Sequence, residues 1–282
     1  MSAGAALFAR LRTLGVDYVF TNSGTDFPPI IEGLAEAQAH DLPLPETLLI
    51  SHEHAAVGMA HGYYLATGRA QAVMLHTNVG LSNGATAAIN AATDQVPMLL
   101  MSGRTPTTER GRFGSRTVPI GWGQEMRDQT ALVREASKWD YELRFPEQVP
   151  ELVDRASAIA NSTPKGPVYL SLPREVLCEQ ITPDGLHTPS KQAPVVAAAP
   201  ARDLAAAADL LAGAKNPLII SQRGTGSEEA FLALGDFLTD WALPLSHYWA
   251  NKLSVPISHP MQVGTQPEAL LAEADVVLVI NS

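Results

Sequence analysis

The stretch LLISHEHAAVGMAHGYYLATGRAQAVMLHTNVGLSNGATAAINAATDQVPMLLMSG, residues 48–103, decides the fold. Short apolar runs begin it, interrupt it and end it, at Leu48–Ile50, Ala72–Leu75 and Met98–Met101. Helical patterns of small residues fill the intervals, the first over Ala55–Thr67 and the second after a glycine-containing turn at Thr77–Gly80. Apolar runs of this length that alternate with helical segments predict βαβ units on a parallel sheet.

Glu53 stands at a position where such sheets bind ligands. It follows the apolar run 48–50 almost directly and precedes a helix, and ligands of open α/β sheets sit outside the carboxyl ends of the strands. From spacing alone, however, the preferred interpretation is an acid that favourably meets the dipole at a helix N-terminus. His76 ends a strand at the same rim, and we interpret it as a hydrogen-bonded rim histidine rather than a catalyst.

Composition bounds the class of protein. The chain has 282 residues, 46% of them hydrophobic, with a net charge of −10 and a pI of about 5.2. These values predict a folded protein of two domains and argue against nucleic-acid binding, which needs clustered cations. The single cysteine, Cys178, excludes a disulfide within the chain and favours a reducing cytoplasm. No signal peptide is apparent and no apolar run approaches the ~20 residues of a membrane span.

The regions flanking this stretch add further expectations. A strand at Val16–Phe20 ends in a polar turn that contains Asn22 and Gly24, where glycine would permit close approach of a ligand. We expect a helix from Pro28 to about Ala39. The polar segment 104–129, which includes Trp122, exceeds the usual loop length and is therefore a functional candidate. A helix is expected over Met126–Ala136.

The C-terminal part of the chain predicts a second α/β unit. Residues 182–200 are rich in proline and lack an amphipathic period, which is typical of a linker. Helical and apolar segments then alternate over 201–282, with a turn at Gly224–Gly226. A lone Gly-x-Gly is a weak indication of dinucleotide binding.

Ordered motifs within residues 48–103 resemble the pyrimidine-binding domain of thiamine-diphosphate-dependent enzymes, in particular acetolactate synthases and 2-oxoacid decarboxylases. A His-Glu pair at 52–53 is followed by Gly-Tyr-x-x-Ala-Thr-Gly at 62–68, a glycine loop with an asparagine at 77–83, and an apolar strand that ends in Ser-Gly at 102–103. The resemblance extends more weakly over nearly the whole chain. It implies an α/β pyrimidine domain at 1–181, a linker at 182–200 and a partial, Rossmann-like central domain at 201–282.

The resemblance also implies roles for particular residues. Glu53 would be the glutamate that hydrogen-bonds the pyrimidine N1′ of the cofactor and activates it. The cofactor would lie against Asn22, Gly24, Thr77, Asn78, Gly80 and Asn83. Gly80 would let the backbone approach the ring, and Asn83 would tie the loop to its helix. His52, His54 and His61 do not have the HExxH spacing, so no metal site is expected in this chain.

Two departures from the family pattern leave the substrate open. Arg104 stands where acetolactate synthases carry glutamine, and it could pair with a substrate anion or lie at a subunit interface. Gln124 and Glu125 resemble the synthase Phe-Gln-Glu element, with Gly123 in place of the aromatic residue. Arg104 and Gln124 are therefore candidate substrate contacts, in an enzyme that is synthase-like more than decarboxylase-like.

The family's diphosphate and Mg²⁺ motif, Gly-Asp-Gly followed by asparagine, has no counterpart in these residues. The strand candidate Val276–Ile280 also lacks following cover. We therefore expect a truncated gene product, or one subunit of a two-chain enzyme, that is inactive alone and works in a dimer or larger oligomer. The central domain binds FAD in some family members and no cofactor in others. The remaining alternative is a non-catalytic, nucleotide-binding α/β protein.

Overall fold

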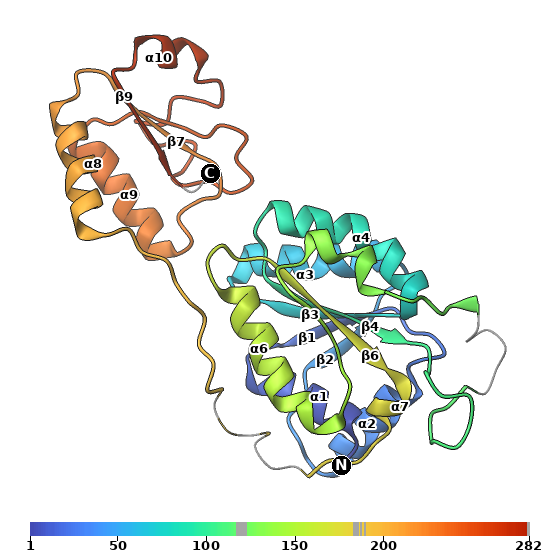
Figure 1. The fold of residues 1–282 in the computed structure, drawn as a ribbon. Helices are drawn as coiled ribbons and strands as arrows, with labels where there is room; N and C mark the ends of the chain where they lie inside the picture. Colours follow the sequence, from blue (N-terminus) through green and yellow to red (C-terminus); the bar gives the residue numbers. More distant parts are fainter. Residues whose placement is uncertain (117–122, 183–185, 187, 189, 281–282) are drawn as a thin grey trace. The chain divides into compact units, whose positions relative to one another are not determined.

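The structure is a computed structural model that describes residues 1–116, 123–182, 186, 188 and 190–280. They form two compact units, Met1–Ala197 and Ala198–Ser282, each with a parallel sheet covered by helices (Figure 1). The boundary between the units falls inside the segment 182–200. The expected α/β fold class is confirmed.

The first unit is built on a six-stranded sheet with the order β2-β1-β3-β4-β6-β5, in which every pairing is parallel. Its strands are β1 (Tyr18–Thr21), β2 (Glu46–Leu49), β3 (Gln71–Leu75), β4 (Met98–Arg104), β5 (Asp140–Glu142) and β6 (Pro167–Pro173). Every residue of β3 and β6 is buried, which explains their continuous apolar character, since parallel strands are covered on both faces.

Helices cover the two faces of this sheet (Figure 1). They are α1 (Ala3–Thr13), α2 (Pro28–Ala39), α3 (Glu53–Thr67), α4 (Thr77–Thr93), α6 (Val149–Asn161) and the short α7 (Arg174–Leu177). Side chains of α1, α2, α6 and α7 share one core cluster, and those of α3 and α4 share another. The sheet therefore separates two hydrophobic cores.

Local chemistry explains several helix ends. Helix α2 begins at Pro28, as expected, because proline at the first helical position loses no hydrogen bond. His52 caps α3 by accepting a hydrogen bond from the His54 amide at 3.2 Å. Gly68 ends α3 in the left-handed conformation, with φ of 72°, as glycine commonly does.

Two local expectations are wrong. Thr77–Gly80 is the first turn of α4 rather than a loop, because the chain turns into the helix at Thr77, which has a φ of 35°. Met126–Ala136 holds two 3₁₀ turns, Thr130–Leu132 and Arg134–Ala136, rather than one helix. There Asp128 accepts from the Ala131 amide and pairs with Arg134, which favours tight turns over a continuous helix. Trp122 lies outside the described residues.

Described residues of the segment 182–200 attach to the first unit. Arg10 on α1 is buried and forms two hydrogen bonds with Asp154 on α6, at 2.6 and 2.7 Å. Its guanidinium also donates to the carbonyls of Leu186 and Thr188, at 2.9 and 2.5 Å. Burial of a charged pair requires such extra partners, so the Leu186 and Thr188 carbonyls are fixed to the domain that precedes the segment.

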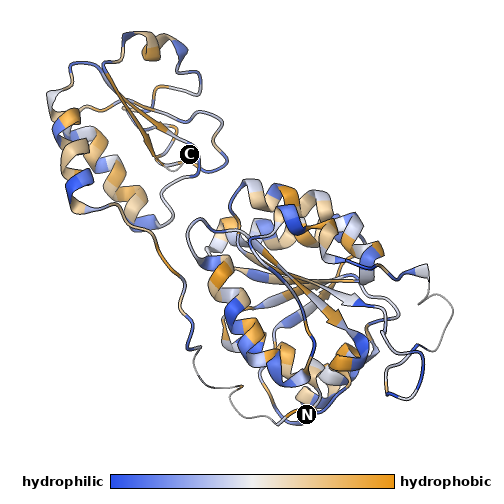
Figure 2. Ribbon diagram, in the orientation of Figure 1, coloured by the Kyte–Doolittle hydropathy of each residue, from blue (hydrophilic) through white to orange (hydrophobic). Residues whose placement is uncertain are grey.

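The second unit has a three-stranded parallel sheet in the order β8-β7-β9. Its elements are α8 (Ala201–Gly213), β7 (Pro217–Ser221), α9 (Glu228–Asp240), β8 (Leu245–Ser246), α10 (Glu268–Glu273) and β9 (Val276–Ile280). Hydrophobic colour runs along β7 and β9 in Figure 2, whereas the helices are mixed. The expected turn at Gly224 and Gly226 places both glycines at positive φ, 73° and 82°.

Candidate active site

The carboxyl ends of β1, β3 and β4 bring together most of the residues that the sequence singles out. Asn22 follows β1 and His76 follows β3, while Glu53 begins α3 beside them. This edge is the usual ligand side of an open parallel sheet.

Glu53 is buried at the first turn of α3, with 8% of its surface exposed. Its Oε2 accepts a hydrogen bond from Asn83 Nδ2 at 3.1 Å. The Asn83 side chain, on α4, therefore binds this carboxylate and not the backbone of a loop. A Cβ added to Gly80 would lie 3.3 Å from Glu53 Oε1. The absence of a side chain at position 80 therefore leaves this second oxygen uncovered on that side.

A second buried carboxylate lies beside this position. Asp26, in the turn between β1 and α2, is 3% exposed. Its Oδ1 is 2.5 Å from His76 Nδ1, and its Oδ2 accepts from the Thr77 amide at 3.3 Å. The hydrogen bond to Asp26 raises the pKa of His76, and the negative charges of Asp26 and Glu53 act in the same direction against partial burial. This edge therefore holds a histidine that binds a proton more tightly than an exposed imidazole does.

Two glycines make room for the Asp26–His76 pair. A Cβ on Gly24 would lie 2.2 Å from the His76 ring, and a Cβ on Gly103 would lie 1.6 Å from Asp26 Oδ2. Both distances are much shorter than a van der Waals contact, so a residue larger than glycine at position 24 or 103 would displace a member of the pair. The close approach expected at Gly24 is thus made by a histidine of the same chain.

The remaining predicted cofactor contacts divide into two kinds. Asn22 holds neighbouring strands together. Its side-chain Nδ2 donates to the Ile50 carbonyl at 2.8 Å, and its backbone N–H donates to the Met74 carbonyl at 3.1 Å. Thr77 Oγ1 and Asn78 Oδ1, in the first turn of α4, are buried without a hydrogen-bond partner. Buried polar atoms of this kind normally have partners, so this turn offers hydrogen bonds to a further group.

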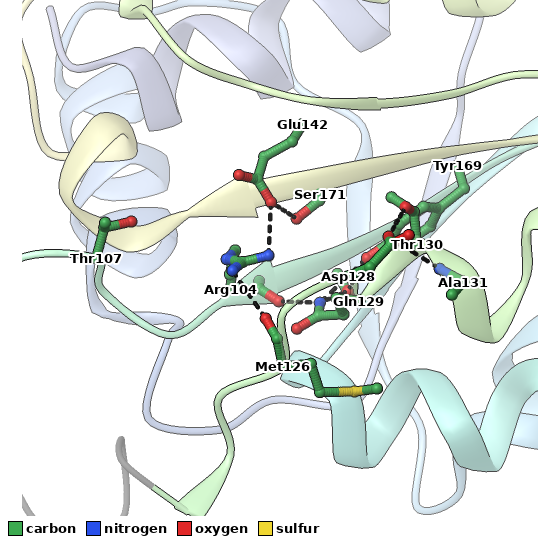
Figure 3. A network of polar contacts seen from close by, with 12 residues as sticks. Arg104, Thr107, Met126, Asp128, Gln129, Thr130, Ala131, Glu142, Tyr169 and Ser171 are labelled. Atoms are coloured by element: carbon green, nitrogen blue, oxygen red, sulfur yellow. Dashed lines mark hydrogen bonds and ion pairs between the residues drawn. The ribbon is translucent and has the colours of Figure 1, made fainter.

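Both candidate substrate contacts lie near this edge, but of the two it is Gln124 that contacts His76. Its Nε2 lies 3.1 Å from His76 Nε2, and its Oε1 is buried without a partner. Arg104 donates instead to Glu142 Oε2 and to the Met126 carbonyl, each at 2.9 Å (Figure 3). Arg104 thus ties the end of β4 to β5 and to the segment that carries Gln124.

Sequence reasoning did not identify Asp26 or the role of Gln129. Gln129 is buried and donates to Ser102 Oγ and the Gly103 carbonyl, each at 2.8 Å, and to Tyr169 OH at 3.1 Å. A single acid in a turn and a glutamine in a polar loop carry no spacing signal of their own. The only available hint was the pair of glycines, Gly24 and Gly103, whose backbones admit close neighbours.

Among the residues that the structure describes, no three His, Cys, Asp or Glu side chains are grouped so that they could hold a metal ion. Within the same residues, no helix has the length and apolar character needed to cross a bilayer.

Comparison with known proteins identifies the family. The model for the thiamine pyrophosphate enzyme N-terminal TPP binding domain matches residues 1–132, and that for the thiamine pyrophosphate enzyme central domain matches residues 204–282. A Pseudomonas aeruginosa protein named "Probable 2-ketoarginine decarboxylase" is 31% identical over 294 residues, covering 100% of this chain and 49% of its own. The acetolactate synthase large subunit of Lactococcus lactis is 24% identical over 294 residues, and the match covers 100% of this chain and 48% of the synthase subunit.

Benzoylformate decarboxylase of Pseudomonas aeruginosa is 27% identical over 289 residues, covering 99% of this chain and 51% of its own. The chain thus spans about half the length of the curated relatives it matches. Among solved structures, the thiamine diphosphate-dependent 4-hydroxybenzoylformate decarboxylase of Rhodococcus jostii has the same fold, with a TM-score of 0.82 at 24% identity over 99% of this chain and 52% of that one. The two domain models match the chain one after the other, the N-terminal model before the central one. The chain therefore belongs to the thiamine pyrophosphate enzyme family and contains its N-terminal and central domains.

Proposed function

We propose that this chain supplies the pyrimidine-activating side of a thiamine diphosphate site in an enzyme that acts on a 2-oxoacid. The observation that carries the proposal is the buried Glu53 carboxylate, which Asn83 holds by one oxygen while Gly80 leaves the other uncovered. A carboxylate so placed can share a proton with a ring nitrogen.

The residues of this edge fit the cofactor. Gly80 provides a surface without a side chain next to Glu53, and Thr77 Oγ1 and Asn78 Oδ1 are unpaired polar atoms in the same helical turn. When bound, thiamine diphosphate supplies the carbon nucleophile and the electron sink for cleavage next to a 2-oxoacid carbonyl. The chain's own contribution is to orient the pyrimidine and to move a proton at Glu53, because general acid–base groups act within hydrogen-bond reach.

His76 gives the site a second group that handles protons. Asp26 lies 2.5 Å from its Nδ1, and this hydrogen bond raises the pKa of His76 above its usual value. Glu53 and His76 come from different elements, and the negative charge of Glu53 adds to the increase in the pKa of His76. We propose that Glu53 serves the cofactor and that His76 serves the substrate.

The outer faces of α3 and α4 support assembly with another chain. Helix α4 contains no Asp, Glu, Lys or Arg, and Glu53 is the sole such residue of α3. Met59, Val79 and Ile89 are 43%, 45% and 56% exposed. Helices at a permanently hydrated surface normally carry charges, so we propose that a second protein chain covers this face, as a homodimer partner or as a separate subunit.

We further propose that the diphosphate and Mg²⁺ are held by a domain outside these 282 residues, in the same polypeptide or in a partner chain. The relative with 31% identity is named "Probable 2-ketoarginine decarboxylase", which favours decarboxylation as the reaction. Carboligation, as in acetolactate synthases, is the second candidate, and Gln124 favours it because the residue belongs to the synthase-like Gln-Glu element and contacts His76. FAD binding by the central domain stays open.

A calorimetric titration tests the proposal. The protein is assembled with the polypeptide that carries the diphosphate domain and titrated with thiamine diphosphate plus Mg²⁺, with FAD and with NAD. We expect thiamine diphosphate to bind and NAD to give no heat. Binding of NAD without thiamine diphosphate would replace the proposal with a non-catalytic nucleotide-binding protein.

A further inference from the structure

Gln124 presents a side-chain amide to His76 in an arrangement that depends on where the histidine carries its proton. Asp26 accepts at Nδ1, so the neutral ring keeps its hydrogen there and exposes a lone pair at Nε2. The Gln124 NH₂ group, 3.1 Å away, donates to that lone pair. In this arrangement Gln124 Oε1 is buried and has no hydrogen-bond partner among the residues that the structure describes.

The charged ring reverses these requirements. Protonated His76 carries hydrogen on both nitrogens and needs an acceptor at Nε2. A half-turn of the Gln124 amide would place Oε1 there and remove the unpaired buried oxygen, which is a costly group to leave unsatisfied. The two orientations of an amide have nearly the same shape, so the exchange needs no movement of the backbone.

The charged groups around His76 favour the protonated ring. Asp26 comes from the turn before α2 and Glu53 from α3, and both are negative and buried. The arginines of the neighbouring strand and segment are engaged with their own carboxylates, Arg104 with Glu142 and Arg116 with Glu125. Helix α4, which His76 precedes, contains no charged residue.

Two anchors hold the part of the segment that follows Gln124. Arg104 fixes the Met126 carbonyl at 2.9 Å, and Glu142 holds the arginine (Figure 3). Gln129 fixes the end of the segment on the Gly103 carbonyl at 2.8 Å and on Tyr169 at 3.1 Å. These bonds tie the chain at positions 126 and 129 to the end of β4, close to the residue that contacts His76.

We propose that Gln124 is a positioning residue that stabilises protonated His76 through Oε1 and, with its amide reversed, holds neutral His76 through its NH₂ group. The proposal deepens the function proposed above, because it describes how a proton is kept next to Glu53. Its test needs no cofactor and no turnover, so its failure is distinct from failure of thiamine diphosphate binding.

The test is an NMR titration of His76 in the 282-residue chain, with resonances assigned by a His76→Gln variant. Hydrogen bonds to charged groups are stronger than those to neutral groups. Gln124→Leu should therefore lower the proton affinity of His76, by about fivefold if the difference is near 1 kcal/mol. Gln124→Glu, which offers only acceptors and a negative charge, should raise it. Gln38→Leu, on the exposed side of α2, is the matched control and should change nothing.

A second readout separates this role from a merely structural one. In the unmodified chain, the Gln124 side-chain NH₂ resonances should shift with the same midpoint as His76, because the group changes partner when the ring changes charge. The proposal is overturned if Gln124→Leu leaves the His76 midpoint in place or raises it, or if the NH₂ resonances do not follow the His76 titration.

Discussion

The carboxylate of Asp26 occupies the space that a side chain on Gly103 would need, since an added Cβ would lie 1.6 Å from Asp26 Oδ2. Gly103 belongs to β4 and Asp26 to the turn after β1, so residues 77 positions apart in the sequence (103 − 26) depend on each other. The position of Asp26 in turn fixes His76 at 2.5 Å. The missing side chain of a strand glycine is therefore part of the candidate active site.

Gly103→Ala should expel Asp26 from its position and lower the proton affinity of His76 by about tenfold, the loss expected for a charge-assisted hydrogen bond. Forced overpacking of this kind should also destabilise the chain by about 1–3 kcal/mol. NMR titration and urea unfolding measure the two effects. Gly62→Ala is the control, because no atom lies within 4 Å of its added Cβ and alanine is favoured in a helix by up to about 1 kcal/mol.

Asp26→Asn should make stability less dependent on pH in the range where His76 titrates. The hydrogen bond to Asp26 raises the pKa of folded His76 above the unfolded value. The resulting stabilisation is complete below the unfolded pKa of about 6.5 and disappears as pH rises through the folded pKa. The difference in unfolding free energy between the unmodified chain and Asp26→Asn should thus be larger at pH 5.5 than at pH 8.5. An equal difference at both pH values would contradict a stabilising role for the hydrogen bond between Asp26 and His76.

In the central domain, His247 should make folding sensitive to acid. Burial lowers its pKa, and its Nε2 accepts a hydrogen bond from the Ser254 amide at 3.0 Å, which a protonated ring cannot do. Stability from this group is present above the unfolded pKa of about 6.5 and is lost as pH falls through the folded pKa. Thermal unfolding of His247→Gln, compared with His40→Gln, should show a weaker loss of stability between pH 7 and pH 5. An unchanged acid response would assign the sensitivity elsewhere.

Much of the fold could be predicted from the sequence, because the signals are local. The glycine stop at Gly68, the proline start at Pro28 and the apolar strand at Val276–Ile280 each follow from the chemistry of a few adjacent residues. The start of α4 was missed, since nothing in Thr77 itself indicates its φ of 35°. The short edge strand β5, Asp140–Glu142, is only partly buried and so lacks an apolar run.

The candidate site was predictable only in part, for a related reason. Glu53 and Gly80 belong to an ordered motif, and the structure places them together. Asp26 and Gln129 act through tertiary hydrogen bonds to residues distant in the sequence, and no local pattern records such partners. Arg104 was a candidate for a substrate contact or a subunit interface, because it stands where acetolactate synthases carry glutamine, and its ion pair with Glu142 has no local pattern in the sequence either.

The proposal that a second protein chain covers α3 and α4 can be tested by placing charged side chains on the two helices. Met59→Lys with Ile89→Lys changes two side chains that are 43% and 56% exposed, so the stability of the chain itself should change by no more than about 0.5 kcal/mol for each. Association with the partner should weaken at least about tenfold, since buried apolar contacts dominate such interfaces. Sedimentation equilibrium measures this, with Ile257→Lys in the central domain as the control. Unaltered association would place the interface on another face.

The most direct measurement of the central proposal is the turnover rate of the complete, cofactor-loaded enzyme with Glu53→Gln, beside Glu32→Gln on the exposed side of α2. Glutamine can still accept a hydrogen bond from Asn83 but cannot exchange a proton with the pyrimidine. The account predicts a loss of kcat on the order of 10²–10⁴-fold for Glu53→Gln and none for Glu32→Gln. A Glu53→Gln enzyme that turns over its 2-oxoacid at the unmodified rate would contradict it.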